Sequence, residues 1–103
     1  SMKINFLFSK TYDFLMSLDD SSVKKIIKSL GLLEQYGHTI RYPHTKYISD
    51  GVFELRIIGA NNIRVFFVFK SKEAVVLHAL IKKTQRIQRK DINYVLHLKN
   101  KLQ

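Results

Sequence analysis

The sequence contains no cysteine, only one proline and few acidic residues. Without cysteine the chain forms neither disulfides nor thiolate metal sites, which fits a reducing cytoplasm. Eight Asp and Glu stand against eighteen Lys and Arg, so the formal net charge is +10. In a chain this small, such a field attracts nucleic acid, an anionic membrane or an acidic protein, and it says nothing about fold.

Long hydrophobic runs are also missing. The longest apolar run is VFFVF, which is far too short to span a membrane, and no signal-peptide pattern opens the chain. Aliphatic and aromatic residues nevertheless make up 46% of the 103 residues, so the chain can bury a core. We expect a single domain over residues 2–103, with Ser1 as the remnant of a removed tag.

Hydrophobic periodicity predicts an α+β fold. Apolar residues recur at helical spacing after the polar run at residues 19–22, and Gly37 is expected to end that helix. The stretch from His38 to Gly51 is interpreted as a loop that ends in an Asp50-Gly51 turn. The predicted order is β-α-α-β-β-β-α, a small twisted antiparallel sheet with helices packed on one face. Strands are predicted over residues 3–8, 52–58, 63–70 and 74–81, and helices over 11–18, from 23 to about 36, and from about 89.

Two arginines stand among large apolar side chains in neighbouring strands. Because side chains alternate between faces, Arg56 shares a face with Glu54, opposite Phe53, Leu55 and Ile57. If the fully apolar sets form the core side, Arg56 and Arg64 lie together on an open face. That register requires the loop from Gly59 to Asn62 to act as a three- or five-residue connection, or to include a bulge.

Further cations follow the last predicted strand. We expect this group and the two arginines to form one patch that binds phosphate, since guanidinium donors match phosphate oxygens. A surface ladder of ion pairs, with Glu54 pairing Arg56 or Arg64, explains the arginines equally well. The group consists of Lys82, Lys83, Arg86, Arg89 and Lys90.

Several short motifs, in order, resemble one known family. DGVFELR, then IRVFFVF, then VVLHALIKKTQRIQRKDI match its pattern of Gly-aromatic-Glu-Leu-Arg, an Arg-aromatic strand, Leu-His and Lys-Lys-Thr before the last helix. On these residues the chain resembles the HigB-like, phage-derived Gp49-like branch of the RelE/ParE toxin superfamily. The resemblance covers nearly the whole chain and implies a RelE-like fold of the microbial RNase type.

The resemblance also implies a function. Members of the superfamily are toxins of type II toxin–antitoxin pairs, and most cleave mRNA on the ribosome. A metal-independent endoribonuclease of this kind needs no cofactor, inhibits translation, and has a cognate antitoxin as partner, here a HigA-like helix-turn-helix protein. Carried over by position, Arg64, Arg56 and Lys83 are the catalytic candidates. Lys82, Arg86, Arg89, Lys90 and His78 are candidates for RNA binding.

The residue that transfers the proton stays open at this stage. Some family members place a tyrosine or histidine near the start of the last helix, where this chain has Gln88, Arg89 and Lys90. Tyr94 lies further along, and a lysine or arginine would serve only with a strongly lowered pKa. His78 is either a base or RNA contact, or a half-buried histidine hydrogen-bonded within the sheet.

Other surface features and functions remain as alternatives. Lys24, Lys25 and Lys28 form either a solvated helix face or a contact with ribosomal RNA. Tyr42 and Tyr47, with Arg41, either pack a loop or grip a base or the antitoxin. The competing functions are a non-catalytic RNA- or ribosome-binding module on the same fold, and a basic domain that binds only an acidic protein.

Overall fold

A five-stranded mixed sheet organises the protein. The computed structural model describes residues 1–102. The strand order across the sheet is β1-β5-β4-β3-β2, in which β1 runs parallel to β5 and all other neighbours are antiparallel. The strands are β1 (Lys3–Phe6), β2 (Thr45–Ser49), β3 (Val52–Ile58), β4 (Asn62–Lys70) and β5 (Glu73–Ile81).

Within residues 1–102, three α-helices and one short 3₁₀ helix complete the fold, and the longest ends at Gly37 as predicted but begins at Asp20, inside the polar run. Asp19 caps this helix through its carboxylate, which accepts the backbone N–H of Ser22, and Gly37 closes it with a φ of 52°. The C-terminal helix begins at Arg89, as predicted. The helices are α1 (Ser9–Met16), α2 (Asp20–Tyr36), η1 (Gly37–Thr39) and α3 (Arg89–Lys101).

The pairing of β3 with β4 confirms the register expected from side-chain alternation. Arg56 lies directly opposite Arg64, and Leu55 lies opposite Val65. The last pair is Ile58 with Asn62, which leaves a three-residue connection between the strands. This is one of the loop lengths that the shared face of the two arginines requires.

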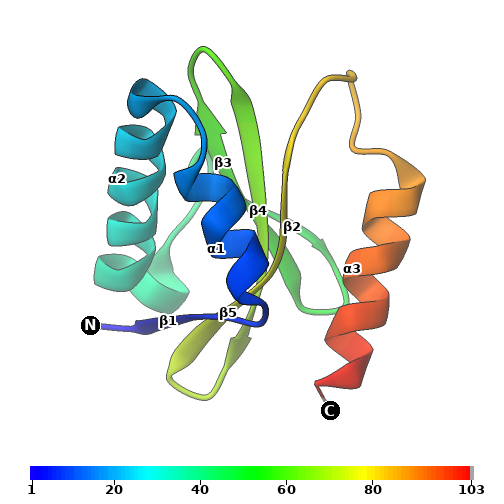
Figure 1. The fold of residues 1–103 in the computed structure, drawn as a ribbon. Coiled ribbons are helices and arrows are strands. Elements are labelled where there is room, and N and C mark those ends of the chain that lie inside the picture. Colours follow the sequence, from blue (N-terminus) through cyan, green and yellow to red (C-terminus); the bar gives the residue numbers. More distant parts are fainter. Residues whose placement is uncertain (103) are drawn as a thin grey trace.

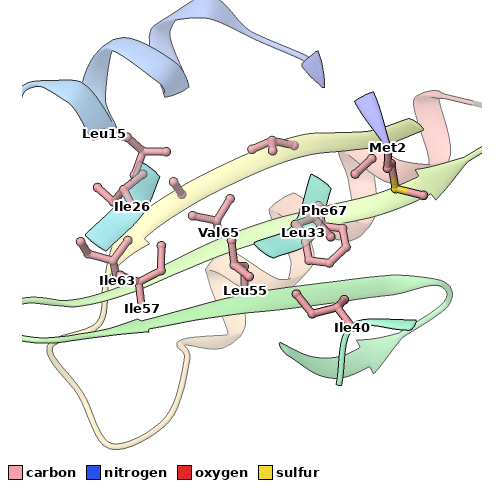
Figure 2. Packing of buried hydrophobic residues seen from close by; sticks show 13 residues of the cluster. Met2, Leu15, Ile26, Leu33, Ile40, Leu55, Ile57, Ile63, Val65 and Phe67 are labelled. Carbon is pink, nitrogen blue, oxygen red and sulfur yellow. The ribbon is translucent and has the colours of Figure 1, made fainter. Parts of the chain in front are cut away.

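Both faces of the sheet are covered, which corrects the prediction that helices pack on one face only. In Figure 1, α1 and α2 lie on one side of the sheet and α3 lies on the other. Figure 2 shows the first core, where Leu15 of α1 and Ile26 of α2 lie over Ile63 of β4. A second core holds Val52, Phe66, Val68, Val75 and Leu77 against Val95 and Leu98 of α3.

The sheet also differs from the predicted one in extent. Residues 45–49, expected as loop, form β2 and pair with β3 through a hairpin whose turn residues Asp50 and Gly51 have φ of 52° and 83°. Two successive positive φ values are typical of a two-residue type I′ turn, and Asp-Gly favours that turn. The first strand joins the sheet beside β5 in parallel, so the sheet is mixed rather than antiparallel.

None of the helices within residues 1–102 combines the length and apolar character that crossing a membrane requires.

Candidate functional site

The face of the sheet beneath α3 carries two rows of side chains that run across β3, β4 and β5. Leu77 interrupts the pairing of β4 with β5, because Phe66 pairs with His78 while Phe67 pairs with Val76. This bulge places His78 and Leu80 on the same face as the arginines. One row is Glu54, Phe66 and His78, and the next is Arg56, Arg64 and Leu80.

Arg64 is buried, which corrects the prediction of an open face. Only 3% of its surface and 5% of that of Glu54 is exposed. Nε of Arg64 lies 3.7 Å from Oε2 of Glu54, and its NH1 group donates to the carbonyl oxygen of Ile63 at 3.2 Å. A buried charge needs such a partner, so Glu54 is what makes an arginine tolerable here. The ion-pair interpretation therefore describes the observed contacts of Arg64.

Arg56 occupies the partly exposed end of the same row. Its Nε lies 3.8 Å from Oε1 of Glu54, and a fifth of its side chain is exposed. The guanidinium lies over the ring of Tyr42 at 5.3 Å from the ring centroid, a cation–π contact, and also reaches the carbonyl oxygen of Pro43 at 3.4 Å. Glu54 thus holds two guanidiniums, of which Arg56 is the one that solvent reaches.

The surroundings of Arg64 lower its pKa in the direction expected for crowded cations. Burial is the main cause, and the charge of Arg56 adds to it, while Glu54 opposes both. A guanidinium stays protonated in proteins even so, because its ordinary pKa lies far above neutral pH. Arg64 therefore serves as a fixed positive charge and not as a base.

A pocket of about 220 Å³ lies where β5 passes into α3. Leu80, the neighbour of Arg64 across the strands, forms part of its wall, so the pocket adjoins the arginine row. The connection between β5 and α3 closes the other side, where the hydroxyl of Thr84 donates to the carbonyl oxygen of Arg86. We call this the basic pocket; it is lined by Leu80, Ile81, Lys82, Lys83, Thr84, Ile87, Gln88, Lys90 and Asp91.

Three of the five predicted cations after β5 meet in the basic pocket. Lys82, Lys83 and Lys90 line it, with Lys82 anchored by its backbone N–H, which donates to the carbonyl oxygen of Asn62 at 2.6 Å. Arg86 on the connection and Arg89 at the start of α3 are exposed but do not line the pocket. Clustered lysines at a concave surface favour a phosphate group over a neutral ligand.

His78 lies beside the basic pocket and meets α3. Its Nε2 is 3.5 Å from Oδ1 of Asp91, and three quarters of each of these two side chains is buried. The imidazole lies against Phe66 and meets the edge of Tyr94, with ring centroids 6.2 Å and 5.1 Å away. Burial lowers the pKa of His78 most strongly, Asp91 raises it, and Lys10 of α1 lowers it.

Sequence reasoning missed Asp91 and did not connect Tyr94 with His78. An acidic residue in the first turn of a helix is ordinary, because it complements the helix dipole, so Asp91 carried no distinctive signal. Its spacing from Tyr94 does put both residues on one face of α3. What the sequence lacked was the position of α3 over β5.

A second basic groove, of about 230 Å³, lies beside the end of β3. Lys25 and Lys28 of α2, which are both exposed, line it together with His44 and Arg56. Nζ of Lys25 also donates to the carbonyl oxygen of Ile58 at 3.2 Å. Arg56 therefore connects this groove with the arginine row.

The tyrosines of the predicted loop are exposed. Tyr42 is 72% and Tyr47 is 55% exposed, and both line a groove of about 440 Å³ with Arg41 and Lys46. Among residues 1–102, no three histidine or acidic side chains lie close enough together to hold a metal ion.

Comparison with known proteins places the chain in a family and supports its fold. The model of the family described as phage-derived protein Gp49-like matches residues 13–100. The solution structure of the conserved hypothetical protein HP0894 from Helicobacter pylori is similar, with a TM-score of 0.53 at 18% identity over 84% of this chain and 100% of that one. At that identity the likeness concerns the fold alone. No curated protein matches the sequence.

Proposed function

We propose that this chain, which belongs to the phage-derived Gp49-like family, a RelE-like toxin family, is the HigB-like toxin of a type II toxin–antitoxin pair. Its activity would be that of a metal-independent endoribonuclease that cleaves mRNA on the ribosome and so stops translation. That target implies action in the cytoplasm. A HigA-like helix-turn-helix antitoxin, encoded beside it, would neutralise the toxin.

The observation that carries this proposal is the basic pocket at the end of the arginine row. RNA cleavage without a metal needs fixed cations for the charge that builds on the phosphoryl oxygens and a group that takes the proton of the 2′-hydroxyl. Lys82, Lys83 and Lys90 supply the cations at the pocket, and Arg56 supplies one at the far end of the row. In this proposal Arg64 acts from behind these residues, through the field of its charge.

Growth and transcript ends test the proposal. Expression of the chain without an antitoxin should arrest growth and create new transcript 5′ ends within codons. The double variant Lys82→Ala/Lys83→Ala should relieve the arrest. The matched control is Lys99→Ala/Lys101→Ala, which removes the same charge from the C-terminal end of α3, about 15 Å along the helix from the pocket residue Lys90 at 1.5 Å per residue. Equal loss of toxicity in both variants would show that only net charge matters.

One observation favours the alternative of a non-catalytic RNA- or ribosome-binding module. The buried side chain of Arg64 is paired with Glu54 and exposes only 3% of its surface, so it does not offer its guanidinium to a phosphate in this conformation. Such a module would slow translation and bind ribosomes without new 5′ ends. Growth arrest with intact transcripts would therefore replace the enzyme proposal with this one.

A further inference from the structure

Phosphate binding by the basic residues of this face does not account for the pair formed by His78 and Asp91. Within residues 1–102, His78 is the only histidine on the strands of the candidate site, and it meets a carboxylate contributed by a different element. Nε2 of His78 is buried and makes no hydrogen bond, at 3.5 Å from Oδ1 of Asp91. A histidine placed for structure alone would be expected to have this nitrogen satisfied. The pair is thus brought together at a distance slightly longer than an ordinary hydrogen bond.

The carboxylate determines which ring nitrogen can take a proton. Asp91 faces Nε2, so the tautomer that carries its hydrogen on Nε2 is favoured, and Nδ1 then holds the free lone pair. Phe66 on one side and Tyr94 at the edge restrict the ring to this orientation. A quarter of the side chain is exposed, so the ring is not sealed from solvent.

The surroundings of the ring also suit a base rather than an acid. The charged and titratable groups that face it are Asp91 and Tyr94 from α3 and Lys10 from α1. Burial and Lys10 both lower the pKa of His78, and their effect exceeds that of Asp91. The imidazole is therefore neutral at pH 7, the form that accepts a proton.

Resting on the proposed function, we infer that His78 is the general base of the cleavage reaction and that Asp91 is its positioning residue. Nδ1 of His78 accepts the proton of the 2′-hydroxyl while the 2′-oxygen bonds to the adjacent phosphorus. The bond from phosphorus to the 5′-oxygen breaks, which leaves a 2′,3′-cyclic phosphate on one fragment. The departing 5′-oxygen takes its proton from water.

The basic pocket lies beside His78, where a bound RNA phosphate would be close to the base. Asp91 both pairs with His78 and lines the basic pocket. Leu80 also lines the pocket and lies two residues after His78 on β5. A phosphate held by Lys82, Lys83 and Lys90 would therefore lie next to the element that carries the base. The lysines are not the base in this arrangement, because they bind the anion, and Arg64 is not the base, because it is buried and stays protonated.

Single-turnover cleavage of mRNA on purified ribosomes, followed from pH 5 to 8, tests the inference. For the wild type, the logarithm of the rate should rise with pH and then level off above the pKa of His78. His78→Gln should lower the plateau at least 100-fold, in the range typical of general-base catalysis, and remove the rising limb. Asp91→Asn should lower the plateau less and move the limb to lower pH, because it removes the group that raises the pKa of His78. Asp91→Glu should restore much of the rate.

Controls separate catalysis from binding and from folding. The exposed His97 of α3 provides the matched variant His97→Gln, which should behave as the wild type. Binding of a 2′-deoxy mRNA, which lacks the attacking hydroxyl, should be unchanged in His78→Gln. If that variant loses affinity as strongly as it loses rate, or cleaves within threefold of the wild type, His78 is not the base. If the wild type cleaves no RNA, the proposed function itself fails, and the role of His78 fails with it.

Discussion

The ion pair between Glu54 and Arg64 leads to a prediction about stability that is separate from activity. At 3.7 Å and an effective dielectric constant of about 20, the attraction between these two charges is about 4.5 kcal/mol. Both groups have also lost their hydration, since no more than 5% of either residue is exposed. Removal of one partner from such a pair typically costs about 3–5 kcal/mol, because the other charge stays buried and uncompensated.

The geometry orders the three possible truncations. Arg64→Ala leaves Glu54 with its second partner Arg56 at 3.8 Å, so we expect a loss near 3 kcal/mol, at the low end of that range. Glu54→Ala leaves two guanidiniums opposite each other, one of them buried, and should cost nearer 5 kcal/mol. Arg56→Ala should cost about 1 kcal/mol or less, because this side chain reaches solvent and its ion pair is weaker.

Urea unfolding followed by circular dichroism measures these losses. A loss of about 3 kcal/mol lowers the thermal midpoint by roughly 12 °C or more in a chain of this size. The double variant Glu54→Leu/Arg64→Met should unfold within about 1 kcal/mol of the wild type, because an apolar pair can replace a buried ion pair without loss. Losses below 1 kcal/mol for both Arg64→Ala and Glu54→Ala, or additive effects in the double variant, would refute the buried pair.

The same double variant clarifies what loss of toxicity means. Arg64→Ala alone confuses the chemistry of Arg64 with unfolding, since it is expected to destabilise the chain. Glu54→Leu/Arg64→Met keeps the fold and removes the buried charge. If the folded double variant stays toxic, Arg64 has no part in the reaction and its role is structural.

Three further perturbations test other parts of the structure. The free energy of unfolding should decrease as the pH is lowered below the ordinary histidine pKa of 6.5, because the lowered pKa of His78 lets the unfolded chain bind more protons than the folded one. In urea titrations from pH 5 to 8, His78→Gln should weaken this dependence. Leu55→Ala, at a fully buried position of the first core, should cost about 2–5 kcal/mol in urea, and a loss under 1 kcal/mol would contradict that core. Gly31→Ala in the middle of α2, where a Cβ meets open space, should stabilise the protein by about 0.5–1 kcal/mol. Gly51→Ala, at a φ of 83°, should destabilise it by at least as much. If both variants shift the thermal midpoint in the same direction, the turn at Gly51 is contradicted.

Sequence alternation was sufficient for the β3–β4 hairpin because one register alone keeps every large apolar side chain of one face together. Leu55 must face the same side as Val65, and that condition placed Arg56 and Arg64 on one face and limited the loop to three residues, five residues or a bulge, of which the structure has the first. The longest and the last helix were equally readable, since their apolar spacing, Gly37 and the polar run before α2 agree with one another.

The rest of the fold depended on contacts between distant segments. β2 is a short edge strand whose Lys46 and Tyr47 are exposed, so it shows little hydrophobic pattern, and β1 finds its parallel partner far along the chain. The covered second face did leave a signal in β5, where consecutive apolar residues from Ala74 to Leu77 indicate a strand buried on both sides. The prediction of an open face for Arg56 and Arg64 overlooked that signal.

At the site, proximity along the chain decided what could be predicted. Lys82 and Lys83 begin the short connection that leads to α3, and Lys90 lies in the first turn of that helix, so their meeting at a pocket follows from sequence. The pair of His78 with Asp91 does not, because it depends on where α3 crosses β5. That crossing is set by the apolar contacts of Val95 and Leu98 with the second core, including Phe66, which also lies against the ring of His78. The residues that bury the far face of the sheet are therefore the ones that bring the proposed base and its carboxylate together, so a cavity made at Val95 should disturb the pH profile of cleavage before it affects binding of RNA at the lysines.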